Sequence, residues 1–224
     1  FSCDFEKGLL NTIQLNFENC KVLGCWFHLS QNLWKHVQSY GLVEKYSTDK
    51  EFYKAFQRLK ALPFVPCDDV VYAFNVIKCN SPVEFNLMLE YFETYYIGKL
   101  KKNSKSVREE PLFAIEIWNV YERIEKDLPR TNNNLEAWHK VFGNDCKKHP
   151  TLHKLINQFR LEQNLTDIIL DQINSGDTYK RRNKQQVIND RIKNVCSNYN
   201  KDKLIDYLDG IISNLKICLL VYIN

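Results

Sequence analysis

Hydrophobic residues follow two different spacings at the start of the chain. Over residues 6–16 they recur at steps of three and four, which is typical of an amphipathic helix. The apolar run 21–27 (KVLGCWF) instead has the length of a buried strand. It leads into a second helical pattern over residues 29–40. The start of the chain therefore predicts a strand end, a helix, a strand and a helix, which is an α/β order.

The middle of the chain, residues 45–128, lacks the alternation of a strand and predicts an aromatic-rich bundle of helices. One helix is expected over residues 48–62, capped by Thr48 and ended by the prolines that follow. Another starts at residues 81–84 (SPVE), a capping pattern, and Gly98 closes it.

Three further helices are expected towards the end of the chain. A long one covers residues 150–173, a basic one residues 179–195, and a weak one residues 203–215. The apolar stretch 215–223 is too short to span a bilayer, so no membrane is expected. The chain as a whole is predicted to be mainly α with a small α/β portion.

Composition adds little that is specific about function. With 44% hydrophobic residues, the 224-residue chain can bury a sizeable core and is not disordered by composition. A net charge of +4 is weak support for a nucleic-acid partner. The eight cysteines show neither disulfide-framework nor zinc-finger spacing, which indicates reduced thiols in a cytosolic or nuclear protein.

Several short motifs follow one another in order along the chain. They are residues 3–6 (CDFE), 24–32 (GCWFHLSQN), 61–66 (ALPFVP), 91–98 (YFETYYIG), 111–113 (PLF), 118–119 (WN), 130–133 (RTNN) and 136–139 (EAWH). Each motif alone is weakly specific. Together, from residue 1 to about residue 164, they resemble the transposase domain of Mutator-like elements (MULEs), in its animal branch.

The resemblance implies an RNase H-like core in which three acidic residues, the DDE triad, hold two divalent metal ions. Asp4 matches the second Asp of the triad and Glu136 matches the Glu. Such enzymes cleave and join DNA with Mg²⁺ or Mn²⁺, which suit oxygen ligands. The resemblance therefore implies a nuclear protein, with transposon ends and target DNA as partners. An oligomer is left open.

This chain departs from the family pattern because the first Asp of the triad and the strands before Asp4 are absent. The expected core is incomplete, with one strand and a strand stub. We therefore expect the chain to be a fragment, the C-terminal part of the domain, with little or no strand-transfer activity.

The resemblance divides the chain into four expected segments. Residues 1–44 would be the C-terminal half of the RNase H-like core, and residues 45–128 a helical insertion. Residues 129–148 would be the core helix that carries Glu136, and residues 149–224 a helical C-terminal extension.

Three residues are candidates for supporting the site. Cys25 and His28 have metal-ligand character, but a zinc site needs about four ligands and no second pair is evident, so zinc is not expected. A structural role beside the site is favoured for both. His139 shares a helical face with Glu136, so it can orient the carboxylate or touch a phosphate. Packing against Trp138 is the alternative.

Basic residues are candidates for DNA contacts. Arg130 precedes the helix of Glu136 and can hold a phosphate at the mouth of the site, or serve as a cap or surface residue. Lys180, Arg181 and Arg182, with the basic loop 99–108, can follow a DNA backbone. A solvated helix face is the common alternative for such runs.

Two other functions remain open. The first is a domesticated or decayed descendant of a transposase, a nuclear module that binds DNA or protein without catalysis. The second is an all-helical interaction domain whose motif matches are chance. The second requires that residues 21–27 form no strand.

Overall fold

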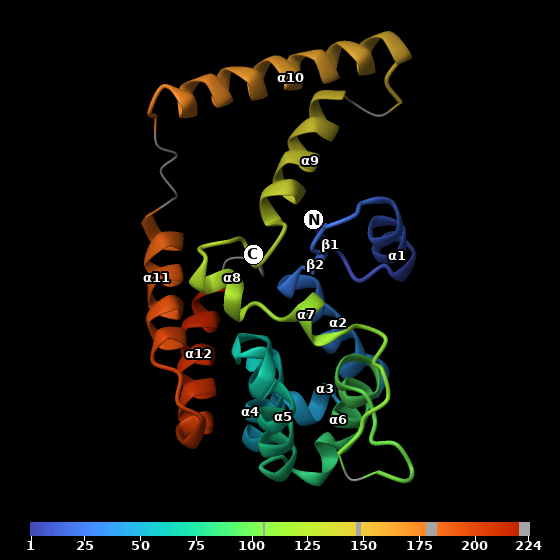
Figure 1. The fold of residues 1–224 in the computed structure, drawn as a ribbon, viewed down its shortest axis with the longest axis vertical. Helices are drawn as coiled ribbons and strands as arrows, with labels where there is room; N and C mark the ends of the chain where they lie inside the picture. The colour runs from blue at the N-terminus through green and yellow to red at the C-terminus, as the bar shows by residue number, and fades with distance from the viewer. Residues whose placement is uncertain (105, 147–148, 178–182, 220–224) are drawn as a thin grey trace. The chain divides into compact units, whose positions relative to one another are not determined.

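The computed structural model describes residues 1–104, 106–146, 149–177 and 183–219, which are mainly helical with one small parallel sheet (Figure 1). The chain divides into two compact units. The first unit contains Phe1–Thr131 and Val187–Asn224, and the second contains Asn132–Gln186. The four segments expected from the resemblance remain a prediction.

The first unit begins with a strand–helix–strand crossover. Its elements are β1 (Ser2–Cys3), α1 (Lys7–Asn16), β2 (Leu23–Gly24) and α2 (Trp26–Ser39). The two strands are parallel, with Ser2 opposite Leu23 and Cys3 opposite Gly24. The expected order is confirmed, and the strand within residues 21–27 contradicts the all-helical alternative.

The second strand is shorter than its apolar run because Trp26 begins the next helix. The indole N–H of Trp26 donates to the carbonyl of Lys60 at 3.0 Å, inside the core. The N–H of Trp26 also donates to the carbonyl of Arg130 at 3.0 Å, which satisfies one free donor at the helix start. Contacts with distant residues therefore decide where the strand ends.

Helices form most of residues 43–125, as expected. They are α3 (Val43–Thr48), α4 (Lys50–Ala61), η1 (Leu62–Phe64), η2 (Cys67–Asp69), α5 (Val70–Cys79), η3 (Val83–Phe85), α6 (Asn86–Phe92), the π-helical η4 (Glu93–Ile97), α7 (Ile115–Trp118) and α8 (Tyr121–Glu125). The cap expected at Thr48 is wrong, because the Asp49 carboxylate accepts from the N–H groups of Glu51 and Phe52 at 2.8 and 3.1 Å.

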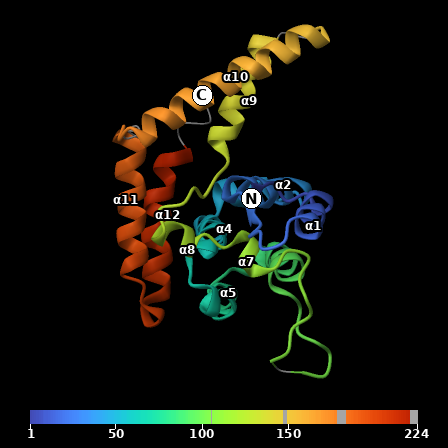
Figure 2. The same cartoon turned by 45° about the horizontal axis from the view of Figure 1, so that its top comes forward.

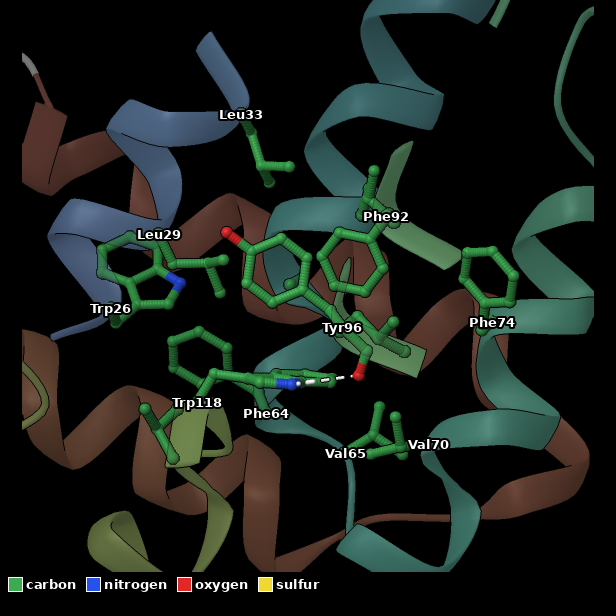
Figure 3. Packing of buried hydrophobic residues seen from close by; sticks show 14 of the residues in the cluster. Trp26, Leu29, Leu33, Phe64, Val65, Val70, Phe74, Phe92, Tyr96 and Trp118 are labelled. Atoms are coloured by element: carbon green, nitrogen blue, oxygen red, sulfur yellow. Dashed lines mark hydrogen bonds between the residues drawn. The ribbon is translucent and has the colours of Figure 1, made fainter. Parts of the chain in front are cut away.

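Aromatic side chains form the centre of this unit (Figure 3). The rings of Phe92 and Tyr96 stack with centroids 4.9 Å apart, and Trp118 meets Phe92 edge-on at 5.5 Å. The indole N–H of Trp118 donates to the carbonyl of Tyr96 at 3.2 Å, as the dashed line in Figure 3 shows. The N–H group of Trp118, the largest fully buried side chain, thus has a hydrogen-bond acceptor.

The chain then returns to the first unit, where its last helix packs on α4. After η5 (Lys201–Lys203), α12 (Leu204–Leu219) lies beside α11 (Asn183–Ser197), as both views show (Figures 1 and 2). Arg58 of α4 binds the Asp209 carboxylate through Nε and Nη2 at 2.9 and 2.7 Å. The hydroxyl of Tyr207 donates to the carbonyl of Phe64.

The second unit contains a pair of long helices, α9 (Asn133–Cys146) and α10 (Leu152–Asn174). Stacked rings join them, with Phe142 between Trp138 and Phe159 at centroid distances of 5.1 and 5.2 Å. The indole N–H of Trp138 donates to Glu162 at 2.7 Å. Among the described residues of both units, no helix is long and apolar enough to cross a membrane.

Candidate functional site

Asp4 follows directly after β1, at the carboxyl edge of the parallel sheet. Cys25 follows β2 at the same edge, and its N–H donates to the carbonyl of Cys3 at 3.0 Å. The side chain of Asp4 is 46% exposed, and its Oδ1 lies 2.8 Å from Nδ1 of His28. The sheet edge therefore presents a carboxylate to solvent with an imidazole beside it.

The two other candidates near Asp4 differ in exposure. His28 lies in the first turn of α2 and reaches the carboxylate, with 24% of its side chain exposed. Cys25, which precedes the helix, is fully buried in the core. The contact between His28 and Asp4 is compatible with the expected supporting role of His28. The supporting roles of His28 and Cys25 both remain predictions.

The residue after Asp4 is anchored in the aromatic core. The ring of Phe5 lies edge-on to Phe113 at 5.2 Å and to Tyr96 at 6.1 Å. The same ring covers Gly24, where an added Cβ would lie 2.6 Å from Cζ of Phe5. The absence of a side chain at Gly24 lets Phe5 pack against β2, and this packing limits the movement of Asp4.

A buried arginine contacts the sheet, and no sequence pattern indicated its burial. Arg123 of α8 is 3% exposed. Its Nη1 donates to the carbonyl of Gly24 at 2.8 Å, and its Nη2 to that of Ile117 at 2.9 Å. Burial lowers the pKa of this guanidinium to about 10, so it is charged at neutral pH. It ties β2 to the segment before α8 and brings a positive charge close to the edge that carries Asp4.

Arg130, the expected phosphate ligand, has contacts within the first unit. Its Nη2 donates to Oδ1 of Asn189 at 2.9 Å, and its guanidinium lies 6.0 Å from the ring of Phe64. The side chain is half-buried. A contact between Arg130 and DNA remains a prediction.

Glu136 lies in the first turn of α9, in the second unit, where it is exposed. Its N–H donates to the carbonyl of Asn132 at 3.1 Å, as at a helix start. The ring of His139 lies 4.9 Å from that of Trp138. Because Asp4 and Glu136 belong to different units, a metal site shared by them remains a prediction.

The basic loop after Gly98 forms a hairpin-like projection. Leu100 and Arg108 form an antiparallel bridge, and Arg108 Nη1 contacts Glu93 at 2.7 Å and the carbonyl of Gly98 at 2.6 Å. Lys101 and Lys102 are exposed on it. The other predicted DNA contacts, Lys180, Arg181 and Arg182, lie outside the described residues.

Within the part of the chain that the structure describes, no three His, Cys, Asp or Glu side chains gather closely enough to hold a metal ion. The Asp4 carboxylate is half exposed and fits the role of a single oxygen ligand to Mg²⁺ or Mn²⁺, ions that commonly retain several waters.

No family model, curated protein or solved structure matches this chain. The resemblance to MULE transposases therefore rests on the motifs and their order. The function that the resemblance implies is a proposal.

Proposed function

We propose that this chain is the C-terminal part of a MULE-type DDE transposase domain, with an incomplete RNase H-like core. The observation that carries the proposal is the position of Asp4, at the carboxyl end of a parallel strand pair joined by a helical crossover. Functional side chains of open parallel sheets gather at this edge. The half-exposed carboxylate is accessible to a ligand there.

Asp4 and Glu136 are the residues that would hold metal. When bound, Mg²⁺ or Mn²⁺ would activate the attacking hydroxyl and stabilise the leaving oxygen of a DNA phosphate. In this chain Asp4 supplies an oxygen ligand, Phe5 anchors the loop that carries it, and His28 orients the carboxylate. In the proposed family a further acidic residue completes the triad, so strand transfer would require that residue together with Asp4 and Glu136.

DNA is the proposed partner, and the nucleus the proposed location. The hairpin with Lys101 and Lys102 presents exposed positive charge to a phosphate backbone, and Arg108 fixes its base through Glu93. Arg130 and residues 180–182 would add further contacts.

The metal ligands can be tested without catalysis. We expect Mn²⁺ to bind the purified chain and both Asp4→Asn and Glu136→Gln to weaken binding by at least about tenfold, because each removes a ligand. The double variant should be little weaker than either single one, since one lost ligand already disrupts a shared site. Electron paramagnetic resonance of free Mn²⁺ measures the affinity.

Asp68→Asn is the matched control, because Asp68 is an exposed acidic residue elsewhere in the first unit. It should leave Mn²⁺ affinity unchanged. Equal affinities for the control, Asp4→Asn and Glu136→Gln would contradict the proposed site.

The second candidate is a domesticated or decayed module that binds DNA or protein without catalysis. The observation that favours it is the 2.8 Å contact between Asp4 and His28, which occupies an oxygen that a metal would use. In that case Mn²⁺ would bind no better to the natural chain than to Asp4→Asn. Sequencing the transcript upstream of Phe1 distinguishes the candidates further, because only the first requires an upstream Asp at a strand end.

A further inference from the structure

Helix α10 carries many apolar side chains and buries none of them. The helix spans Leu152–Asn174, and no residue in it is buried. Its large apolar residues that are at least 43% exposed are Leu152, Ile156, Phe159, Leu161, Leu165, Ile168, Ile169, Leu170 and Ile173. A helix that is apolar on several sides is normally covered by other protein. This length of exposed apolar surface indicates an interface.

The contacts described between α9 and α10 lie on one side of α10. Phe159 stacks on Phe142, and Glu162 accepts from Trp138. At about 100° per residue, Leu161, Leu165 and Ile168 project roughly a quarter turn away from Glu162. These three residues, which we call the free face, are 55%, 55% and 54% exposed.

The charges beside the free face are arranged about its centre. Arg160 lies before Leu165 along the helix, and Asp167 and Asp171 lie after it, all of them exposed. Arg160 is five positions before Leu165 and Asp171 is six positions after it, and both lie on the same flank of the free face.

We propose that the free face pairs with the same face of a second copy of this chain, with the two α10 helices antiparallel. Leu165 then lies on the two-fold axis opposite its own counterpart, and Leu161 meets Ile168 of the second copy. Arg160 faces Asp171 of the second copy, and this pair occurs twice. A parallel pair would place like charges at the same level, which is unfavourable. The inference is independent of the proposed function.

The first test measures the mass of the full chain in solution. Sedimentation velocity should show a dimer at micromolar concentrations, and Leu165→Glu should weaken the dimer roughly 100-fold, because two buried leucines are lost at the axis. Leu15→Glu is the control, since Leu15 is 82% exposed on α1, outside the free face. The control should remain dimeric, and circular dichroism should show all variants folded.

Charge reversal tests the direction of the pair. Arg160→Asp and Asp171→Arg should each weaken the dimer about fivefold, and the variant with both changes should regain the natural affinity. A monomer at all concentrations would overturn the proposal, as would a dimer that Leu165→Glu leaves intact. A double variant that does not regain the natural dimer affinity would exclude the antiparallel pair. Loss of thermal stability in a monomeric Leu165→Glu variant would show instead that the chain covers its own free face.

Discussion

Gly98→Ala is expected to lower the free energy of unfolding by about 3 kcal/mol or more. Gly98 has φ of +88° and ψ of 132°, a conformation that only glycine adopts readily. A Cβ at this position would lie 1.9 Å from the carbonyl oxygen of Glu109. That carbonyl cannot easily move away, because the N–H of Glu109 donates to Lys99 at 2.7 Å and closes the basic hairpin.

Urea unfolding followed by circular dichroism measures this effect. Gly8→Ala is the matched control, because Gly8 lies inside α1 with no atom within 4 Å of an added Cβ. The free energy of unfolding of the control should rise by about 0.5–1 kcal/mol, because alanine stabilises a helix more than glycine does. A Gly98→Ala protein as stable as the natural chain would show that the hairpin can open without cost.

Lys60→Met is expected to raise the free energy of unfolding by about 3 kcal/mol at pH 7. Lys60 is 5% exposed, and its Nζ lies 6.0 Å from the ring centroid of Trp26 and 5.8 Å from that of Phe56. Burial lowers the pKa of its ammonium group to about 8. The folded chain therefore bears a desolvation cost when Lys60 is charged, which the flexible, apolar methionine would remove.

The gain in the free energy of unfolding from Lys60→Met should decrease as the pH rises. The pKa of Lys60 is about 8 in the folded chain and 10.5 as its ordinary value, so the unfolded chain holds the proton more strongly. The free-energy cost of burying charged Lys60 is therefore complete below pH 8 and disappears as the pH rises to about 10.5. The advantage of Lys60→Met over the natural chain should shrink across that range.

Denaturant unfolding at pH 7 and pH 10 checks this prediction. Lys50→Met, at an exposed position in the first turn of the same helix, is the control and should show neither the gain nor its loss. If Lys60→Met destabilises the chain at pH 7, the ammonium group contributes more through its position over the two rings than its burial costs.

The sequence pattern predicted a helix well where interactions between nearby residues determine it. The apolar pattern over residues 150–173 became α10, and Gly98, which was expected to close a helix, ends one with positive φ. Long-range contacts decide other helix boundaries, such as the break between α7 and α8. The break occurs at Asn119, whose side chain donates to Val65 at 2.7 Å and accepts from the N–H of Tyr121 at 2.9 Å.

The site was predictable only in part, because its contacts join distant residues. The motifs indicated Asp4 and His28 separately, but only the folded crossover brings them within 2.8 Å. The burial of Arg123 and Lys60 follows from packing against β2 and Trp26, which are distant in the sequence. Spacing along a sequence does not record such packing.

The hydrogen bond between Arg130 and Asn189 closes the first unit at the place where the second unit is inserted. These residues adjoin the points where the chain leaves the first unit, after Thr131, and re-enters it, before Val187. A segment whose two ends adjoin can be gained, lost or exchanged without displacing its host. The α9–α10 pair can therefore be removed or exchanged while the contact between Arg130 and Asn189 still closes the first unit.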